Sequence, residues 1–334
     1  GAASPVIAAP GMADGVNALV CVHRGGPAVL QIRRYIAVPE CVADDVLVRV
    51  QYAALNRLDH FVRKGWPGLQ LKMPHILGSD GAGTIAAIGE RVEGWQVGQR
   101  VTYNPTLWCG KCAHCVAGDH PYCDEFAMLG EHAPGNYAEF IRVPARNLLA
   151  ITAHADMPDA AATPVVYVTA WRMLFTKGHL QPGETVLIVG AGGGVNTAAI
   201  QLAKFAGAGV YVVAGDANKA QAALGLGADW VVDRSAQPNW GKAVWAKTNT
   251  RGVHAVSYTH FRAHQTVLDL LCHLLLEKKK AIPLIALRHV DIRTNTILDV
   301  SSMSSHYLCA AHSQSSDRLS SQTRPAILHI TPHR

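Results

Sequence analysis

The first half of the chain alternates short apolar segments with turn-forming residues. Residues 18–22, 45–53 and 83–88 are apolar or alternate between apolar and polar positions, and glycine, proline or charged residues separate them. Segments of this length and spacing are typical of strands joined by tight turns. The pattern predicts a mostly antiparallel, barrel-like β domain, to which residues 135–140 return as a further strand. The glycines of residues 80–83 and 94–98 are expected to form sharp turns.

From residue 151 onward, helices are predicted to alternate with buried strands. Two helices are expected at residues 158–162 and 163–175. Residues 186–189 form a β-branched run that is too short for a helix, and residues 197–205 carry apolar side chains at helical spacing. Further strands are predicted at residues 211–214, 230–233 and 252–256. This alternation predicts an α/β fold with a doubly wound parallel sheet.

A glycine-rich turn joins the strand at 186–189 to the helix that follows it. Glycine lets the backbone turn tightly and approach a ligand, and the helix N-terminus presents its first N–H groups to the same point. Such a turn binds a pyrophosphate, so it predicts a dinucleotide cofactor. A glycine turn without a ligand is the alternative. The predicted contact residues are Gly190, Gly192, Gly193, Gly194 and Val195.

The residues after the next strand bear on which dinucleotide is bound. Asp216 lies roughly where a ribose-binding residue is expected. An NAD-specific site needs a carboxylate at the end of this strand, but Gly215 comes first, and Lys219 is near enough to meet a 2′-phosphate. We therefore expect NADP(H) to be favoured over NAD(H), although Asp216 argues for the opposite preference.

Four cysteines in one loop have the spacing C-x2-C-x2-C-x7-C. They are Cys109, Cys112, Cys115 and Cys123. Four thiolates suit a tetrahedral zinc ion with no open position, which predicts one structural zinc in a lobe at about 104–129. An iron–sulfur cluster usually has a different last interval and a following proline, and disulfides would require export. His114 and His120 are expected to be exposed, because the thiolates already fill the coordination shell.

Length and composition exclude several classes of protein. A chain of 334 residues, about half apolar, predicts two domains with substantial cores. The net charge of +6 is spread along the chain without a basic tract, so we expect no nucleic-acid partner. No apolar run is long enough to span a bilayer, and residues 1–11 lack the features of a secretory signal, which predicts a cytoplasmic protein with no membrane partner.

Together these motifs resemble the medium-chain dehydrogenase/reductase superfamily. The residues that carry the resemblance, between about 12 and 256, are CGKCAHC with Cys123, HILGSDGAGTIAAIG, GEHAPGNYAEF, PVVYVTAWRML and GETVLIVGAGGGV. The resemblance implies a GroES-like catalytic domain at 12–150 and a Rossmann domain at 151–256. It also implies a structural zinc, a small-molecule substrate bound beside the nicotinamide, and a homo-oligomer.

The chain departs from the zinc alcohol dehydrogenases of this superfamily at the catalytic metal. Those enzymes usually have a cysteine where this chain has Asn56, His-Glu where it has Ser79 and Asp80, and a cysteine or aspartate near Val165. Asparagine, serine and valine cannot supply thiolate and imidazole ligands. Leu58 occupies the position of the proton-relay hydroxyl. These residues resemble the quinone oxidoreductase branch, which reduces quinones or activated C=C bonds without a catalytic metal.

The resemblance also suggests roles for individual residues. Asn56 would position the substrate or the nicotinamide ribose, and Thr169 would lie behind the nicotinamide. Asp59 is a further catalytic candidate, with a structural turn as its alternative. The expected function is an NADP(H)-dependent reductase of quinones or enones. A zinc alcohol dehydrogenase with an atypical site and a nucleotide-binding protein without turnover are the alternatives.

The last part of the chain has a different composition. No glycine follows Gly252, whereas all 30 glycines lie at or before it. Parallel strands without a glycine at any turn would be unusual. We expect residues 257–334 to be foreign to the native fold and to form helix or coil with few contacts to a truncated Rossmann sheet. A divergent helical C-terminus is the alternative.

Overall fold

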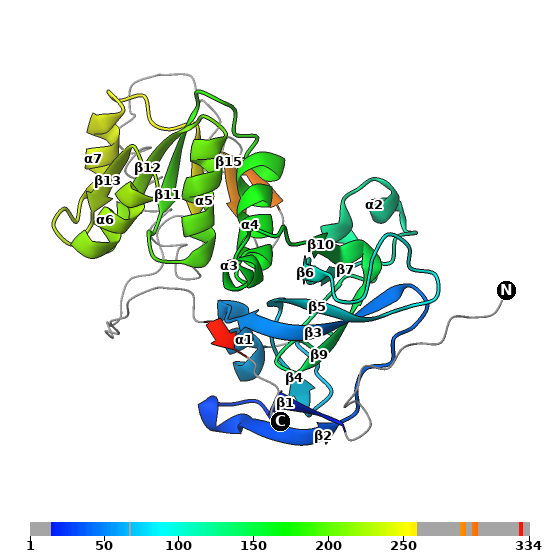
Figure 1. Cartoon of the computed structure of the whole chain (residues 1–334). Helices are drawn as coiled ribbons and strands as arrows, with labels where there is room; N and C mark the ends of the chain where they lie inside the picture. Colours follow the sequence, from blue (N-terminus) through cyan, green and yellow to red (C-terminus); the bar gives the residue numbers. More distant parts are fainter. Residues whose placement is uncertain (1–14, 67, 259–287, 292–295, 300–326, 330–334) are drawn as a thin grey trace. The chain divides into compact units, whose positions relative to one another are not determined.

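The computed structural model describes residues 15–66, 68–258, 288–291, 296–299 and 327–329 (Figure 1). Its contacts divide these residues into two compact units. The first unit ends at Val165 and also includes the strand at 327–329, and the second begins at Val166. The sequence pattern suggested a boundary at 150, before the short helix α3 (Met157–Ala161) that packs on strands of the first unit.

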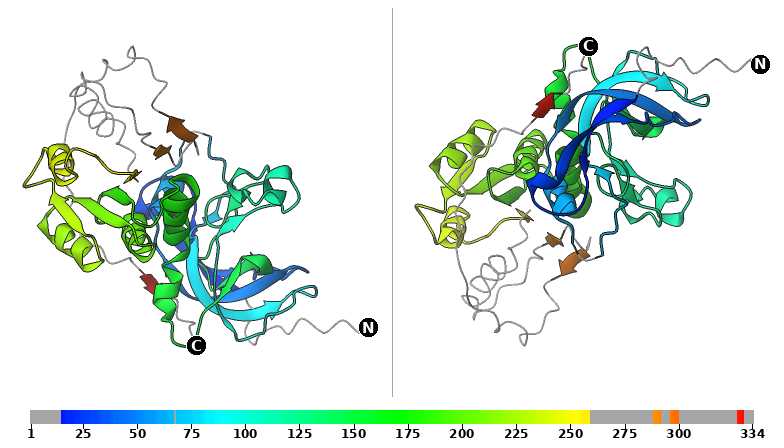
Figure 2. Two further views of the ribbon diagram at one scale, coloured as in Figure 1. Left: turned by 90° about the horizontal axis from the view of Figure 1, so that it is seen from above. Right: turned by 90° about the horizontal axis from the view of Figure 1, so that it is seen from below.

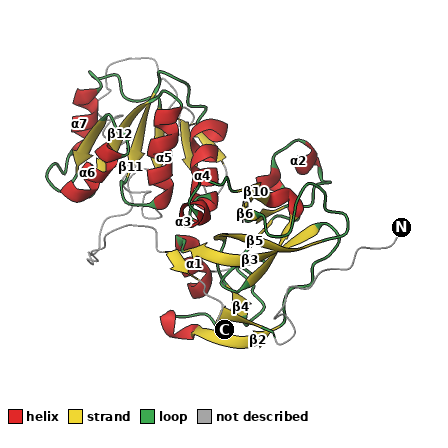
Figure 3. Ribbon diagram, viewed as in Figure 1, coloured by secondary structure: helices red, strands yellow, loops and turns green. Residues whose placement is uncertain are grey.

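The first unit is built mainly from antiparallel strands (Figure 3). Its main sheet has the order β10-β6-β5-β3-β17, with β9 also paired to β3, and a smaller sheet has the order β2-β1-β4. This confirms the predicted β-rich architecture. The strands are β1 (Val16–Cys21), β2 (Leu30–Ile36), β3 (Asp45–Ala54), β4 (His75–Ile76), β5 (Asp80–Ile88), β6 (Arg100–Tyr103), β9 (Phe140–Pro144), β10 (Leu148–Ala150) and β17 (Ile327–His329).

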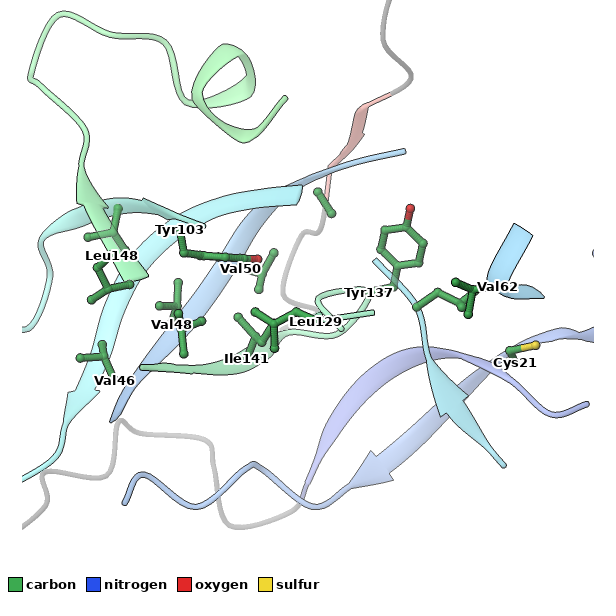
Figure 4. Packing of buried hydrophobic residues seen from close by; sticks show 14 of the residues in the cluster. Cys21, Val46, Val48, Val50, Val62, Tyr103, Leu129, Tyr137, Ile141 and Leu148 are labelled. Atoms are coloured by element: carbon green, nitrogen blue, oxygen red, sulfur yellow. The ribbon is translucent and has the colours of Figure 1, made fainter. Parts of the chain in front are cut away.

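The core of this unit follows from the alternation of side chains along β3. Val46, Val48 and Val50 share one face of the strand and are buried against Ile141 and Leu148 (Figure 4). Alternate residues of a strand point to one face, so the apolar pattern at 45–53 produces this buried stripe. Strands β3 and β5 stay side by side in both views of Figure 2 (blue and cyan).

Two expectations for this unit are wrong. Gly81 and Gly83 lie inside β5 and not in a turn. A Cβ at Gly83 would be 1.9 Å from the carbonyl oxygen of Arg49, so glycine is required there for the close approach of two strands. Residues 135–139 form bends and bridges, and the strand begins only at Phe140. Gly94 and Gly98 do lie in turns, with φ of 77° and 87°.

The second unit is a parallel sheet with helices on both faces. Strands β11, β12, β13 and β14 pair in parallel, as predicted. One face packs against α4, α5 and α6, and the other packs against α7, because alternate strand residues face opposite sides (Figure 1). The elements are α4 (Pro164–Trp171), η4 (Arg172–Lys177), β11 (Thr185–Val189), α5 (Gly194–Phe205), β12 (Gly209–Ala214), α6 (Ala217–Gly225), β13 (Trp230–Asp233), α7 (Trp240–Lys247) and β14 (Ala255–Tyr258).

The described residues after 256 form strands. Strand β14 runs to Tyr258, β15 (Arg288–Asp291) pairs with it in parallel, and β16 (Thr296–Asp299) pairs antiparallel with β15. The sheet order is therefore β13-β12-β11-β14-β15-β16. The expectation of helix or coil with few sheet contacts is wrong for these residues. The rest of 257–334 lies outside the described residues, and its foreign origin stays a prediction.

Candidate functional site

The four cysteines converge in a compact lobe of the first unit. Cys112 is the N-cap of the short helix α2 (Ala113–Val116), Cys115 lies on that helix, and Cys123 follows the 3-10 turn η2 (His120–Tyr122). Their sulfur atoms all lie within 4.8 Å of one another, and those of Cys109 and Cys115 are 3.9 Å apart. Four sulfurs about 2.3 Å from one zinc ion would be about 3.8 Å apart, so the set fits a tetrahedral zinc.

Several backbone N–H groups point at these sulfurs and favour their thiolate form. The N–H of Cys112 lies 3.3 Å from Sγ of Cys109, and those of Cys109 and Glu125 lie 3.2 and 3.3 Å from Sγ of Cys123. Hydrogen bonds, the largest contribution coming from the backbone N–H of Asp124, lower the pKa of the Cys112 thiol to about 6, whereas burial raises the pKa of Cys115. These donors stabilise negative charge on sulfur, which a bound metal requires.

The two histidines of the lobe differ from each other. His114 is exposed, as expected. His120 is half-buried and stacks on Trp108 with ring centroids 4.5 Å apart, so its predicted exposure is wrong. The guanidinium of Arg146 lies 5.0 Å from the centroid of the same tryptophan and donates to its carbonyl oxygen. This stack ties the lobe to the turn before β10.

The glycine turn of the second unit lies between β11 and α5. Gly190 has φ of 104°, which favours glycine, and Gly193 is the N-cap of α5. The helix begins at Gly194, so the N–H groups of Gly194 and Val195 have no acceptor within the helix. Asn196 is buried, and its side-chain amide donates to the carbonyl oxygen of Val189. This geometry suits a bound pyrophosphate.

Charged side chains lie around Gly215, directly after β12. Asp216 is the N-cap of α6; its carboxylate accepts the backbone N–H of Lys219 at 2.9 Å and its ammonium at 2.5 Å. The Lys219 side chain lowers the pKa of Asp216. The guanidinium of Arg234 lies 3.9 Å from where a Cβ of Gly215 would be. Sequence reasoning missed Arg234, although a basic residue directly after the third strand was a usable signal.

The predicted residues Asn56 and Asp59 belong to a polar cluster of the first unit, here called the Asn56 cluster. Its members are Asn56, Asp59, Asp80, Tyr103, Asn136 and Tyr137. Asn56 caps α1 (Arg57–Lys64), and Asp59 in the first turn accepts the backbone N–H of Asn56 at 2.6 Å. The Asp59 carboxylate also accepts the hydroxyl of Tyr137 at 2.8 Å. Asp59 therefore has a defined structural task, and its catalytic role stays a prediction.

Asp80 connects this cluster to the start of α4. One carboxylate oxygen accepts the side-chain amide of Asn56 at 2.9 Å, and the other accepts the backbone N–H of Val165 at 2.8 Å. Asp80 is 1% exposed at the start of β5. Thr169, the third catalytic candidate, lies further along α4 and is partly exposed in the second unit. Its contact with nicotinamide stays a prediction.

Comparisons with known proteins place both units in one family. The family model "Alcohol dehydrogenase GroES-like domain" matches residues 42–153, and "Zinc-binding dehydrogenase" matches residues 194–271. Alcohol dehydrogenase 2 of Caenorhabditis elegans is 33% identical over 244 residues, which are 72% of this chain and 67% of that protein. The chain belongs to the medium-chain dehydrogenase/reductase superfamily. The second match continues past residue 256, where the resemblance was expected to end.

Two further relatives differ in their reported chemistry. The crystal structure of an NAD-dependent alcohol dehydrogenase superposes with a TM-score of 0.72 at 41% identity, covering 76% of this chain and 74% of that one. Crotonyl-CoA carboxylase/reductase of Cereibacter sphaeroides is 35% identical over 214 residues, which are 62% of this chain and half of that protein. The chain is therefore an oxidoreductase of this superfamily. No helix within the described ranges has the length and apolar character to cross a membrane.

The positions at which the resemblance would place catalytic-zinc ligands hold no metal-ligand set within the described ranges. Asn56, Asp80 and Val165 do meet, but they are joined to one another through the two oxygens of a single carboxylate. Ser79 is fully buried, and its hydroxyl donates to the carbonyl oxygen of Leu129 at 2.7 Å. Among the residues that the structure describes, the four cysteines are the one group of three or more metal-ligating side chains.

Burial of the Asn56 cluster gives this protein a predictable pH dependence of stability. Burial raises the pKa of Asp80 to about 7, and it raises the pKa of Asp59 in the same direction. Between about pH 4 and pH 7 the folded chain therefore binds more protons than the unfolded chain, so the unfolding free energy falls as pH rises. The shift at Asp80 corresponds to a loss on the order of 4 kcal/mol.

This effect can be measured by urea unfolding at pH 5 and pH 8. The urea midpoint of the wild type is expected to be lower at pH 8 than at pH 5. Asp80→Asn should show a smaller decrease, because Asp80 no longer contributes to it. Equal declines in the two proteins would show that Asp80 does not titrate in this window.

Proposed function

We propose that the chain is an NADP(H)-dependent reductase that delivers hydride to the β-carbon of an enone, or to a quinone, without a catalytic zinc. The observation that carries the proposal is the pair of hydrogen bonds on Asp80. Its carboxylate is occupied by Asn56 and by the backbone of Val165, at the positions that would otherwise hold a catalytic metal. Neutral amides at these positions favour a reaction that needs no Lewis acid.

The bound nicotinamide would supply the hydride chemistry. Transfer forms a C–H bond at the β-carbon, moves the C=C electrons to the carbonyl oxygen as an enolate, and leaves the α-carbon to take a proton from water. The Asn56 amide is a neutral donor that suits the developing oxyanion. Gly190 to Val195 would hold the pyrophosphate, and Thr169 would back the nicotinamide. The substrate would be a small molecule, and the family suggests a homo-oligomer.

The choice of NADP(H) rests on the charges at the end of β12. Lys219 and Arg234 are both placed around Gly215, where a 2′-phosphate would meet two cations. Asp216 is already engaged by the backbone and side chain of Lys219, so its carboxylate is less available to ribose hydroxyls. Relatives with NAD-dependent in their names support the opposite preference.

The proposal is tested by supplying three substrate classes in parallel. Purified zinc-loaded protein is mixed with NADPH and either 2-cyclohexenone or 1,4-benzoquinone, and with NADP⁺ and a primary alcohol. Oxidation of NADPH with the enone or the quinone, unaffected by extra zinc, is the expected result. Turnover of the alcohol alone would favour an alcohol dehydrogenase, whereas cofactor binding without any turnover would favour a nucleotide-binding protein. A parallel series with NADH separates a wrong cofactor from a wrong substrate.

A further inference from the structure

The Asn56 cluster has one member that reaches solvent. Asp59, Asp80, Tyr103, Asn136 and Tyr137 are all buried, with exposed fractions of 6% or less. Asn56 is only partly buried. Asp59 and Asp80 hydrogen-bond to Asn56, and Tyr137 and Asn136 hydrogen-bond in turn to Asp59 and Asp80, so the buried members support the one accessible amide.

The Asn56 carboxamide is held on two sides. Its nitrogen donates to Asp80 at 2.9 Å, and its oxygen faces the backbone N–H of Asp59 in a capping box at the start of α1, where that N–H also donates to the main-chain oxygen of Asn56 at 3.1 Å. A side-chain amide nitrogen carries two N–H groups. One is used by Asp80, and the other has no hydrogen-bond acceptor among the residues that the structure describes. This arrangement leaves one N–H donor for an external oxygen.

We propose that Asp80 is a positioning residue that sets which side of the Asn56 carboxamide faces the substrate. One oxygen of its carboxylate accepts an N–H of the Asn56 amide, while the other accepts the backbone N–H of Val165. This inference rests on the proposed function, because it assigns the remaining Asn56 N–H to the substrate oxygen that becomes the enolate. An ionised carboxylate accepts only, so it admits the nitrogen of Asn56 and rejects its oxygen.

Protonation would remove this selection. A neutral Asp80 carboxyl can donate to the oxygen of Asn56, so Asp80 then no longer selects one orientation of the amide, and only the capping contact at the start of α1 still does. The pKa of Asp80 is raised to about 7, chiefly by burial; the hydrogen bonds from Asn56 and Val165 oppose this rise, and the charge of Asp59 adds to it. The titratable or charged groups on the segments around Asp80 are, besides Asp59 itself, Asp45, Arg49 and Tyr52 of β3, Arg57, His60, Arg63 and Lys64 of α1, Arg100 and Tyr103 of β6, Asp159 of α3, and Tyr137 before β9.

The amide itself gives a test that does not need turnover. The full zinc-loaded chain is labelled with ¹⁵N-asparagine, and the side-chain signals of Asn56 are identified from their loss in Asn56→Ala. We expect them to shift with a midpoint near pH 7 in the wild type and to stay constant in Asp80→Asn. Asn56 signals that do not titrate, or that titrate equally in both proteins, would overturn the proposal.

A double-mutant cycle tests the link to the reaction. Asp80→Asn should lower kcat/KM for the enone or quinone by about 10- to 100-fold, mainly through kcat. The loss should largely disappear in the Asn56→Ala background, because Asp80 acts through that amide. Equal losses in both backgrounds would contradict the proposal.

Thr102→Val is the matched control. It removes a buried hydrogen bond from β6 to the carbonyl oxygen of Gly81, next to Asp80, without touching Asn56. Its effect on kcat/KM should be small and equal in both backgrounds. If no substrate class is turned over while the Asn56 signals titrate as expected, the proposed function fails and the positioning role stands.

Discussion

Replacing Cys112 with serine is expected to lower bound zinc from one atom per chain to nearly none. The hydroxyl of serine is a poor zinc ligand, and Cys112 lies between Cys109 and Cys115 in a set that requires all four sulfurs. Zinc binding to such a site contributes about 10 kcal/mol or more to local folding, so the lobe at about 104–129 should open. Elemental analysis measures the metal, and limited proteolysis with mass spectrometry locates the new cleavage sites.

Cys41→Ser is the matched control for the zinc prediction. Cys41 is partly buried in the same unit and lies outside the lobe, with its thiol near the carbonyl oxygen of Asp45. This variant should keep one zinc and the wild-type proteolysis pattern. Two zinc atoms per wild-type chain would contradict the absence of a catalytic metal. Retention of zinc by Cys112→Ser would contradict the four-sulfur site.

Removing either of the two cations near Gly215, Lys219 and Arg234, is expected to abolish the preference for NADPH. Arg234→Ala and Lys219→Ala should each weaken NADPH binding by about 10- to 100-fold, because each removes one charge-assisted contact to the 2′-phosphate. NADH has no such phosphate, so its dissociation constant should change little in Arg234→Ala. In Lys219→Ala it should stay the same or fall, because Asp216 loses its ion pair and can meet the ribose hydroxyls.

Dissociation constants for both nucleotides come from fluorescence titration of the full chain. Lys242→Ala is the control, since it removes an exposed cation on α7 of the same unit. It should leave both constants unchanged. Tighter binding of NADH than NADPH by the wild type would show that Asp216 occupies the ribose position and that the preference was assigned the wrong way.

The local sequence by itself determined those elements whose contacting residues lie close together in the chain. The cysteine loop spans residues 109–123, and its spacing alone predicted a four-sulfur group that the structure brings within 4.8 Å. The strand, glycine turn and helix at 185–205 were likewise predictable. In both cases the signal is a short spacing of residue types that few backbone conformations can satisfy.

Only the tertiary structure decided contacts between distant residues. Asp80 forms hydrogen bonds with Asn56, which is 24 positions away in the sequence, and with Val165, which is 85 positions away. Arg234 reaches Gly215 through the parallel pairing of β12 and β13, and β17 pairs with β3 from the far end of the chain. Periodicity specifies which face of an element is buried, but it does not specify which element covers that face. The glycines of β5 resembled turn residues for the same reason. The strand that packs closely against Gly83 is β3, which is distant in the sequence.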